Sequence, residues 1–262
     1  MKKSVLWSML AGSPIAIVLL ASCSPSVWSN SGLTAVQASG KSESTPKAEI
    51  TAKGPVGLYY MQKYWIATRH LEKSVWYFTP DGQAYENPTG LSQEALAAHQ
   101  GNKGRLKFSS DELEIVWTNG QPQNGKIERD EGDPAGFAWD TGMFAPANPI
   151  KDAKSIAGTY EGGTSMSFGG GSTMVAKTLE LNENGTYKAT GIASATAASD
   201  GTLAKVAGEG ETTGTWSTTD FTLTLRDSKG KSVSGIAFPL FEDKKTKISE
   251  RFFFQGFVYK RR

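Results

Sequence analysis

The feature that most restricts the fold of this chain is a set of short segments in which apolar and polar residues alternate. Residues 221–226 read Phe-Thr-Leu-Thr-Leu-Arg, and residues 113–115 and 178–181 follow the same rule. Successive strand residues point to opposite faces, so this period places one face on a core and the other in water. Gly, Asn and Asp between these segments are typical of turns. We therefore expect an all-β protein with antiparallel strands.

The first 23 residues have the pattern of a bacterial export signal. Two lysines precede an apolar run from Val5 to Leu20, and small residues then lead to Cys23. The last four residues, Leu20-Ala21-Ser22-Cys23, resemble the lipobox of bacterial lipoproteins at every position. This resemblance implies that residues 1–22 are removed as a signal peptide and that Cys23 is acylated. The alternative is an uncleaved membrane helix, against which Pro14 and the limited length of the run both argue.

The predicted lipid anchor also predicts where the protein works. Acyl chains on Cys23 would hold the chain to a lipid bilayer of the cell envelope, since each buried methylene contributes about 0.8 kcal/mol. Ser24, where an Asp would imply inner-membrane retention, implies the outer membrane if the host has two membranes. Residues 24–54 are rich in Ser, Thr, Lys, Gly and Pro, which predicts a flexible tether with a reach of about 30 Å.

Cys23 is the only cysteine in the chain. Exported proteins enter a compartment in which disulfides form, but one thiol cannot make an internal bridge. Stability must then come from core burial and strand pairing. The same count excludes a catalytic cysteine further along the chain, and two histidines are too few for a histidine-rich metal cluster.

Beyond the tether the chain divides into two similar β units, residues 55–150 and 151–262. Gly57-Leu58-Tyr59 matches Gly158-Thr159-Tyr160, and the later turns match at an offset of roughly 100 residues. The alternative is that any series of hairpins looks self-similar, because turns require Gly and Asn. One short helix is expected near residues 92–99, between Ser92 as a cap and Gly101 beyond its end.

The second unit resembles small bacterial lipocalin-like domains. The resemblance rests on Gly-Thr-Tyr at 158–160, Asn-Gly-Thr-Tyr at 184–187, Gly-Thr-Trp at 214–216 and an aromatic last strand at 251–259. It implies an antiparallel barrel whose interior is either packed solid or holds a small apolar ligand. The first unit matches the same pattern more loosely, and its helix departs from it.

Aromatic residues supply the candidate ligand-binding positions. Tyr64 and Trp65 lie in one aromatic run, and Trp76 and Phe78 lie in another. Most such residues fill the core of a β protein. A contiguous run must nevertheless point to both faces of a sheet, so some of these rings are exposed or lie under a second layer. This predicts a surface that contacts carbohydrate or lipid.

Charged motifs give weaker hypotheses. Glu128, Asp130 and Asp133 form an acidic cluster that offers oxygen ligands for calcium, although their spacing does not match the known helix-loop-helix pattern and a solvated loop is the simpler interpretation. The segment 171–178 resembles a phosphate-binding loop, but it alternates like a strand and lacks one required glycine. With 28 basic and 26 acidic residues, and an excess that comes from Lys2 and Lys3, the mature chain is close to neutral, so we expect no nucleic-acid partner.

These patterns together predict a non-enzymatic envelope lipoprotein without a cofactor. It would bind a small hydrophobic ligand or an envelope protein. One alternative is a scaffold with a solid-packed barrel that acts only through protein contacts. Another is a hydrolase of envelope glycans that uses carboxylates of the acidic loop, although no nucleophile elbow or catalytic triad is recognisable in the sequence.

Overall fold

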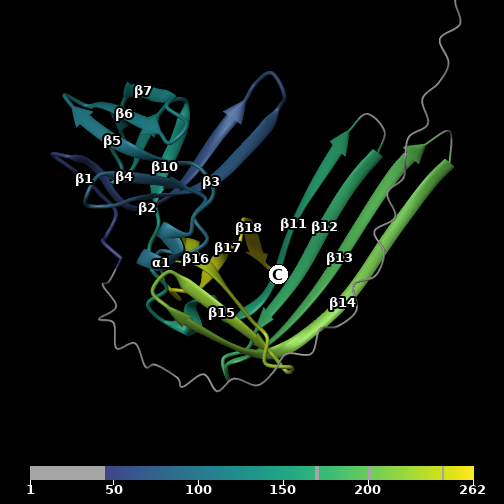
Figure 1. Ribbon diagram of the computed structural model, residues 1–262. Coiled ribbons are helices and arrows are strands. Elements are labelled where there is room, and N and C mark those ends of the chain that lie inside the picture. The colour runs from purple at the N-terminus through teal and green to yellow at the C-terminus, as the bar shows by residue number, and fades with distance from the viewer. Residues whose placement is uncertain (1–44, 169–170, 200–201, 244) are drawn as a thin grey trace, which may run out of the picture. The chain divides into compact units, whose positions relative to one another are not determined.

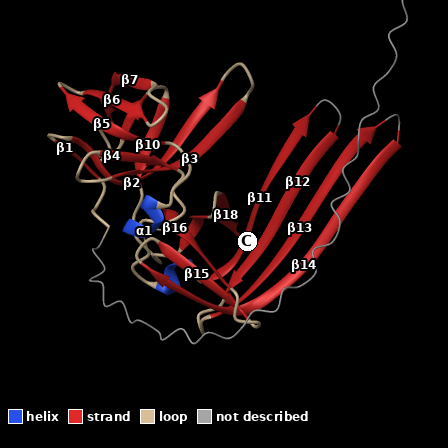
Figure 2. Cartoon of the chain, viewed as in Figure 1, coloured by secondary structure: helices blue, strands red, loops and turns tan. Residues whose placement is uncertain are grey.

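The computed structural model describes residues 45–168, 171–199, 202–243 and 245–262, and the regular secondary structure in this part of the chain is almost entirely β-strand (Figures 1 and 2). The predicted all-β class is confirmed. The predicted helix is also present, as α1 (Gln93–Ala97), and the Ser92 side chain caps it by accepting a hydrogen bond from the Ala95 amide at 3.2 Å. Cys23, the predicted signal and most of the predicted tether lie outside the described residues.

In the described part of the chain, the first sheet has ten strands. They are β1 (Glu49–Thr51), β2 (Gly54–Trp65), β3 (His70–Phe78), β4 (Gln83–Glu86), β5 (Lys103–Ser109), β6 (Glu112–Trp117), β7 (Pro122–Lys126), β8 (Glu128–Arg129), β9 (Phe137–Trp139) and β10 (Gly142–Pro146). Nine of them pair in the order β7-β6-β5-β4-β3-β2-β10-β9-β8, and β1 pairs with the start of β2. The two edge strands, β7 and β8, are separated in sequence only by the buried Ile127. The sheet is therefore a nearly closed antiparallel barrel.

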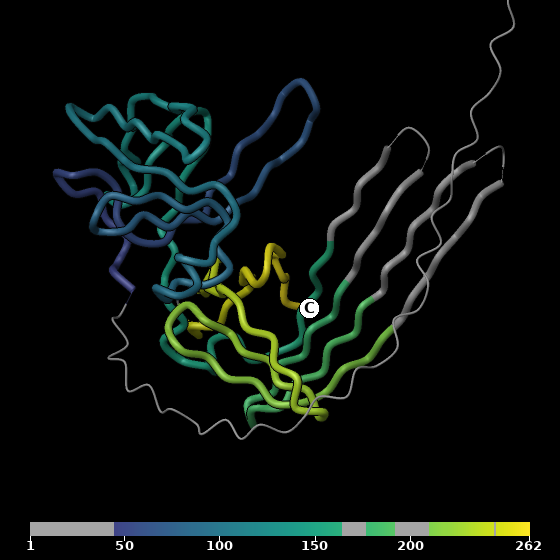
Figure 3. Tube along the Cα trace, viewed as in Figure 1, coloured from purple at the N-terminus to yellow at the C-terminus, as the bar shows by residue number. Residues whose placement is uncertain are grey.

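The second sheet is a closed antiparallel barrel of eight strands in sequence order. They are β11 (Gly158–Phe168), β12 (Gly171–Leu181), β13 (Thr186–Ser199), β14 (Thr202–Thr219), β15 (Thr222–Asp227), β16 (Ser232–Glu242), β17 (Ser249–Phe254) and β18 (Phe257–Arg261). The chain completes the first sheet and passes through a short 3₁₀ helix, η1 (Ala153–Ile156), before it enters this barrel (Figure 3). The segment that resembles a phosphate-binding loop lies in β12 as extended strand, which agrees with its alternating pattern.

The two units repeat the same turns at matching places. Gly82 and Gly185 have φ angles of +81° and +80°, which only glycine adopts without strain. Their amides donate to the carbonyls of Thr79 and Asn182 at 3.0 and 2.9 Å. The last hairpin of each unit turns through two residues with positive φ, Asp140-Thr141 in one and Gln255-Gly256 in the other.

The closing strands are equivalent as well. The last strand of each unit pairs with the first long strand, β10 with β2 and β18 with β11. The main difference is that β7 and β8 together occupy the place that the single strand β16 takes in the closed barrel. The predicted two similar β units are therefore present in the strand order and not only in the turn residues.

Three cores stabilise the described residues. The first barrel is filled by a cluster that includes six aromatic side chains, Tyr59, Trp76, Phe78, Phe137, Trp139 and Phe144. The described end of the second barrel is filled around Tyr160, Trp216, Phe252 and Tyr259. A third cluster joins residues of both sheets, and in it the Tyr60 ring lies 6.1 Å from Phe238 and 6.0 Å from Phe253. Among the described residues, no helix has the length and apolar character required to cross a membrane.

Candidate binding site

Strand β2 runs from the core of the first barrel to one end of that barrel. Its inward-facing residues alternate along the strand, and Tyr59 and Met61 are buried in the core. The next two residues on the same face, Lys63 and Trp65, lie where β2 ends and β3 begins. Tyr64, between them, faces the other side of the sheet. We call this end of the barrel its mouth.

A pocket of about 190 Å³ lies at the mouth. Its lining residues are Met61, Lys63, Trp65, Glu72, Trp76, Glu86, Gln123, Trp139, Asp140, Gly142 and Phe144. The buried side chains of Met61, Trp76, Trp139 and Phe144 belong to the core and form its floor. The remaining side chains are polar or, in Trp65, partly exposed. The mouth pocket thus combines an apolar floor with a charged rim.

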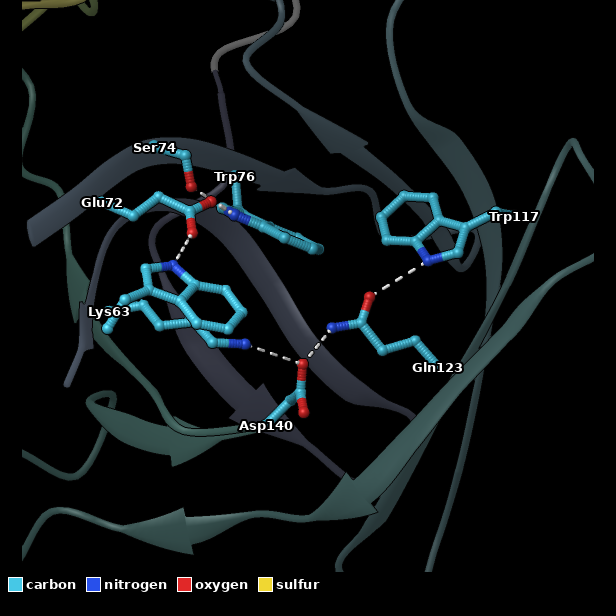
Figure 4. Close-up of polar contacts among 8 residues, drawn as sticks. Lys63, Glu72, Ser74, Trp76, Trp117, Gln123 and Asp140 are labelled. Atoms are coloured by element: carbon cyan, nitrogen blue, oxygen red, sulfur yellow. Dashed lines mark hydrogen bonds and ion pairs between the residues drawn. The ribbon is translucent and has the colours of Figure 1, made fainter. Parts of the chain in front are cut away.

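A chain of hydrogen bonds fixes one side of the rim (Figure 4). The Trp117 indole Nε1 donates to Gln123 Oε1 at 3.1 Å, and Gln123 Nε2 donates to Asp140 Oδ2 at 2.6 Å. Lys63 Nζ lies 3.3 Å from the same carboxylate oxygen. Asp140 reaches this position because it is the first residue of the β9–β10 turn, with φ of +47°. Partly exposed ion pairs add little stability, so the network mainly orients these side chains.

Trp65 forms the opposite side of the rim. Its indole Nε1 donates to Glu72 Oε2 at 2.7 Å, and Lys63 Nζ lies 4.5 Å from the centroid of its ring. Such a cation–π contact contributes roughly 0.5–1 kcal/mol at an exposed site. The residue nevertheless keeps 46% of its surface exposed. An oriented aromatic ring is therefore available to solvent beside the pocket.

The structure brings together two of the four aromatic residues that the sequence singled out. Trp65 and Trp76 both line the mouth pocket. Phe78 has no exposed surface and belongs to the core of the first barrel. Tyr64 is 57% exposed but lies on the other face of the sheet. Whether any of the four contacts a ligand stays a prediction.

Sequence reasoning missed the polar part of this site. Glu72, Glu86, Gln123 and Asp140 come from different strands and turns, and nothing in the linear pattern connects them. The position of Lys63 could have been predicted, because it lies two residues before Trp65 and therefore on the same face of the strand.

The acidic cluster lies apart from this pocket, at β8 and the loop after it. Asp130 Oδ1 accepts a hydrogen bond from the Gly132 amide at 2.8 Å, and Asp133 Oδ1 accepts one from the Ala135 amide at 3.1 Å. Glu128, in β8, is exposed. The part of the chain that the structure describes contains no group of three or more His, Cys, Asp or Glu residues arranged to hold a metal ion. Asp130 and Asp133 thus stabilise turns, and the structure shows no set of calcium ligands formed by the three residues.

A second hollow, of about 520 Å³, lies beside α1 and the loop that follows it. His99 lines it, but its ring packs against Tyr85 and its Nε2 lies 3.3 Å from the Asn102 carbonyl oxygen. None of the tryptophans that line the mouth pocket takes part in it. The mouth pocket is therefore the better candidate site.

At its described end, the interior of the second barrel is filled by side chains around Tyr160, Phe252 and Tyr259. Arg261 donates to the Tyr160 hydroxyl at 2.6 Å and to the Ala157 carbonyl at 2.7 Å, and its guanidinium lies 4.8 Å from the Tyr160 ring centroid. Burial raises the pKa of Tyr160 to about 12 although Arg261 opposes the shift. The aromatic ring of Tyr259 stacks on Phe252 nearby. This end of the barrel is a packed core.

Fold and site together define an all-β protein of two antiparallel barrels, one closed and one nearly closed, with an aromatic and charged pocket at the mouth of the first. No family model, no curated protein and no solved structure matches the chain.

Proposed function

We propose that this protein is a lipid-anchored, non-enzymatic envelope protein that binds a saccharide ring at the mouth of its first barrel. The observation that carries the proposal is the half-exposed Trp65 ring beside a pocket whose rim is polar. A sugar ring has an apolar face of C–H groups and a periphery of hydroxyls. It therefore needs an aromatic surface together with convergent donors and acceptors.

The size of the pocket supports a small polar ligand over a lipid-like one. Sites that enclose a drug-sized apolar molecule usually measure about 300–1,000 Å³, whereas the mouth pocket measures about 190 Å³. The interior beneath it is filled by aromatic side chains. The filled interior therefore leaves no room for the small hydrophobic ligand expected from the sequence. The pocket at the mouth is large enough for a single sugar ring.

The rim supplies both kinds of hydrogen-bonding group. Lys63 and the amide of Gln123 donate, and the carboxylates of Glu72, Glu86 and Asp140 accept. Each of these carboxylates already accepts a hydrogen bond from the protein: Glu72 from Trp65, Glu86 from Asn102 and Asp140 from Gln123. Carboxylates oriented in this way can accept hydrogen bonds from sugar hydroxyls.

A second candidate is a scaffold that works through protein contacts. It is favoured by the apolar residues exposed around the β2–β3 hairpin and on β10, which are Tyr64, Ile66, Leu71 and Met143. Clusters of exposed apolar side chains often mark interaction surfaces. Tyr64 and Trp65 are neighbours on opposite faces, so the two candidates depend on different residues.

The test is a titration of the mature protein with glucose, galactose and N-acetylglucosamine, followed by tryptophan fluorescence and calorimetry. We expect binding in the millimolar range, and Trp65→Ala should weaken it by about tenfold because the stacking surface is lost. Tyr64→Ala is the matched control on the same strand and should bind as the parent does. Absence of binding by all three sugars, or equal losses in both variants, would contradict the saccharide site. Release of a cleaved product from a chitin oligosaccharide would contradict the non-enzymatic part.

The anchor is tested separately. Mass spectrometry of the native N-terminus should show acylated Cys23, and Cys23→Ala should move the protein from the membrane to the soluble fraction. The expectation follows because two or three acyl chains bind a bilayer firmly whereas an unmodified tether does not. A native chain that begins at Met1 with a free thiol would overturn the envelope assignment. That the second barrel is lipocalin-like stays a prediction, and neither test depends on it.

A further inference from the structure

We infer that the mouth pocket selects a positively charged saccharide, an amino sugar, over neutral and acidic sugars. This inference rests on the proposed saccharide site and adds the charge of its ligand. Its basis is an imbalance of charge around the rim, combined with the aromatic walls.

The rim carries one positive and three negative side chains. Lys63 opposes Glu72, Glu86 and Asp140, which leaves a net charge of two negative at neutral pH. Lys63 forms its ion pair with Asp140. Within the described residues, neither glutamate has an ion-pair partner.

The two glutamates are held by neutral donors instead. Glu72 accepts from the Trp65 indole at 2.7 Å, and Glu86 accepts from the Asn102 amide at 2.8 Å. A neutral donor orients a carboxylate without cancelling its charge. Neither hydrogen bond cancels the formal charge of its glutamate, although Glu86 and Asn102 also line the second hollow beside α1.

The aromatic lining also favours a positively charged ligand. Trp65, Trp76 and Trp139 contribute ring systems whose faces attract cations. The ammonium of Lys63 lies 4.5 Å from the Trp65 ring centroid, so a cation contacts this indole within the protein itself. An acidic sugar would instead meet two carboxylates that form no ion pair within the described residues. The rim therefore discriminates by charge, while Trp65 provides the surface for the ring.

The closing experiment compares three sugars that share one ring and differ in charge: glucose, glucosamine and glucuronate. Titrations of the mature protein are run at slightly acidic pH and low salt, so that the sugar amine is protonated. We expect glucosamine to bind about three- to tenfold more tightly than glucose, as one partly exposed charge contact allows. Glucuronate should bind more weakly than glucose. The advantage of glucosamine should shrink in high salt, because ions screen exposed charges.

Variants assign the effect to named side chains. Glu72→Gln and Glu86→Gln preserve shape and an accepting oxygen but remove the charge, so each should lower the ratio of glucosamine affinity to glucose affinity two- to threefold. Glu128→Gln, which removes an exposed charge outside the pocket, is the control and should leave the preference unchanged.

The outcomes separate this inference from the proposed function. If all three sugars bind equally, or if Glu128→Gln changes the preference as much as the rim variants do, charge selection is wrong and the saccharide site remains. If ethanolamine binds as tightly as glucosamine, the pocket recognises an amine without a ring and the amino-sugar assignment is wrong. If no sugar binds, the saccharide site itself is wrong.

Discussion

At the scale of single residues, the barrel cores combine aromatic packing with buried hydroxyl groups. Tyr160 and Tyr259 have almost no exposed surface in the second barrel. The Tyr160 hydroxyl accepts a hydrogen bond from Arg261, and the Tyr259 ring stacks on Phe252 with centroids 5.2 Å apart. Burial disfavours the charged phenolate, and it raises the pKa of each of these two tyrosines to about 12.

This shift predicts a loss of stability in alkali. An unfolded chain loses its tyrosine protons near pH 10, whereas the folded chain keeps these two until about pH 12. Above pH 10 the unfolded state therefore binds fewer protons, and the free energy of unfolding falls as pH rises through this window, by up to roughly 1.4 kcal/mol per pH unit for each tyrosine. Below pH 10 these groups cause no pH dependence. Urea unfolding at a series of alkaline pH values would measure the slope.

Tyr259→Phe provides the control for that measurement. It keeps the stacked ring and removes one titrating group, so the slope between pH 10 and 12 should decrease by the share of one tyrosine. A variant whose stability falls as steeply as that of the parent would show that Tyr259 does not carry the effect.

At the scale of elements, close approach between neighbouring strands depends on particular glycines. A Cβ atom placed on Gly214 in β14 would lie 1.9 Å from the Arg226 carbonyl oxygen, which is backbone of the paired strand β15. Gly104 in β5 is equivalent, since its Cβ would lie 2.7 Å from the Val116 carbonyl oxygen in β6. A Cβ on Gly191 in β13 would meet nothing within 4 Å.

We predict opposite effects of the same substitution at two glycines of the second barrel. Gly214→Ala should destabilise the protein by about 3 kcal/mol, because backbone atoms of β15 must move. Gly191→Ala should be neutral or stabilise by up to about 1 kcal/mol, because alanine costs less conformational entropy in a strand. Thermal unfolding of both variants measures the difference, and similar midpoints would contradict the close strand approach at Gly214.

The element scale also shows what the pattern of residues can reveal. Alternation and turn residues predicted strands, the short helix and the repeated order of hairpins. They did not predict that β2 ends at Trp65 with an exposed hairpin beyond it. Ile66 is 83% exposed there, although its side chain is as apolar as those in the cores. Apolar character reports a tendency to be buried, but only the neighbours in space determine whether burial occurs.

At the scale of the whole molecule, the two barrels share a core. Leu58, Tyr60 and Val75 from the first sheet pack in one cluster with Ile236, Phe238 and Phe253 from the second. The Phe238 and Phe253 rings stack at 5.0 Å, and Tyr60 lies against both. Because removal of either sheet would expose these residues, each barrel stabilises the other.

Because the two barrels share this cluster, we predict that a substitution that destabilises one barrel also destabilises the other. Phe238→Ala should lower the free energy of unfolding by about 3–5 kcal/mol, as expected for a large ring in a core. In a Trp216→Phe background the tryptophans that remain in the described residues are Trp65, Trp76, Trp117 and Trp139, and all four belong to the first barrel. We expect the unfolding midpoint measured by tryptophan fluorescence to fall together with the circular-dichroism midpoint. A fluorescence midpoint unaffected by Phe238→Ala would show that the barrels unfold independently.

The sequence by itself determined the strand class, the repeat, the helix and the candidate anchor, because these depend on residues near one another in the chain. It also selected Trp65 and Trp76 as candidates among many aromatic residues. The tertiary structure alone decided that these two meet at a barrel mouth while Phe78 is buried and Tyr64 faces away. It alone assembled the charged rim, since Lys63 and Asp140 lie 77 residues apart and become neighbours only when β10 pairs with β2. Contacts between distant strands depend on closure of the sheet, and no local pattern encodes that closure.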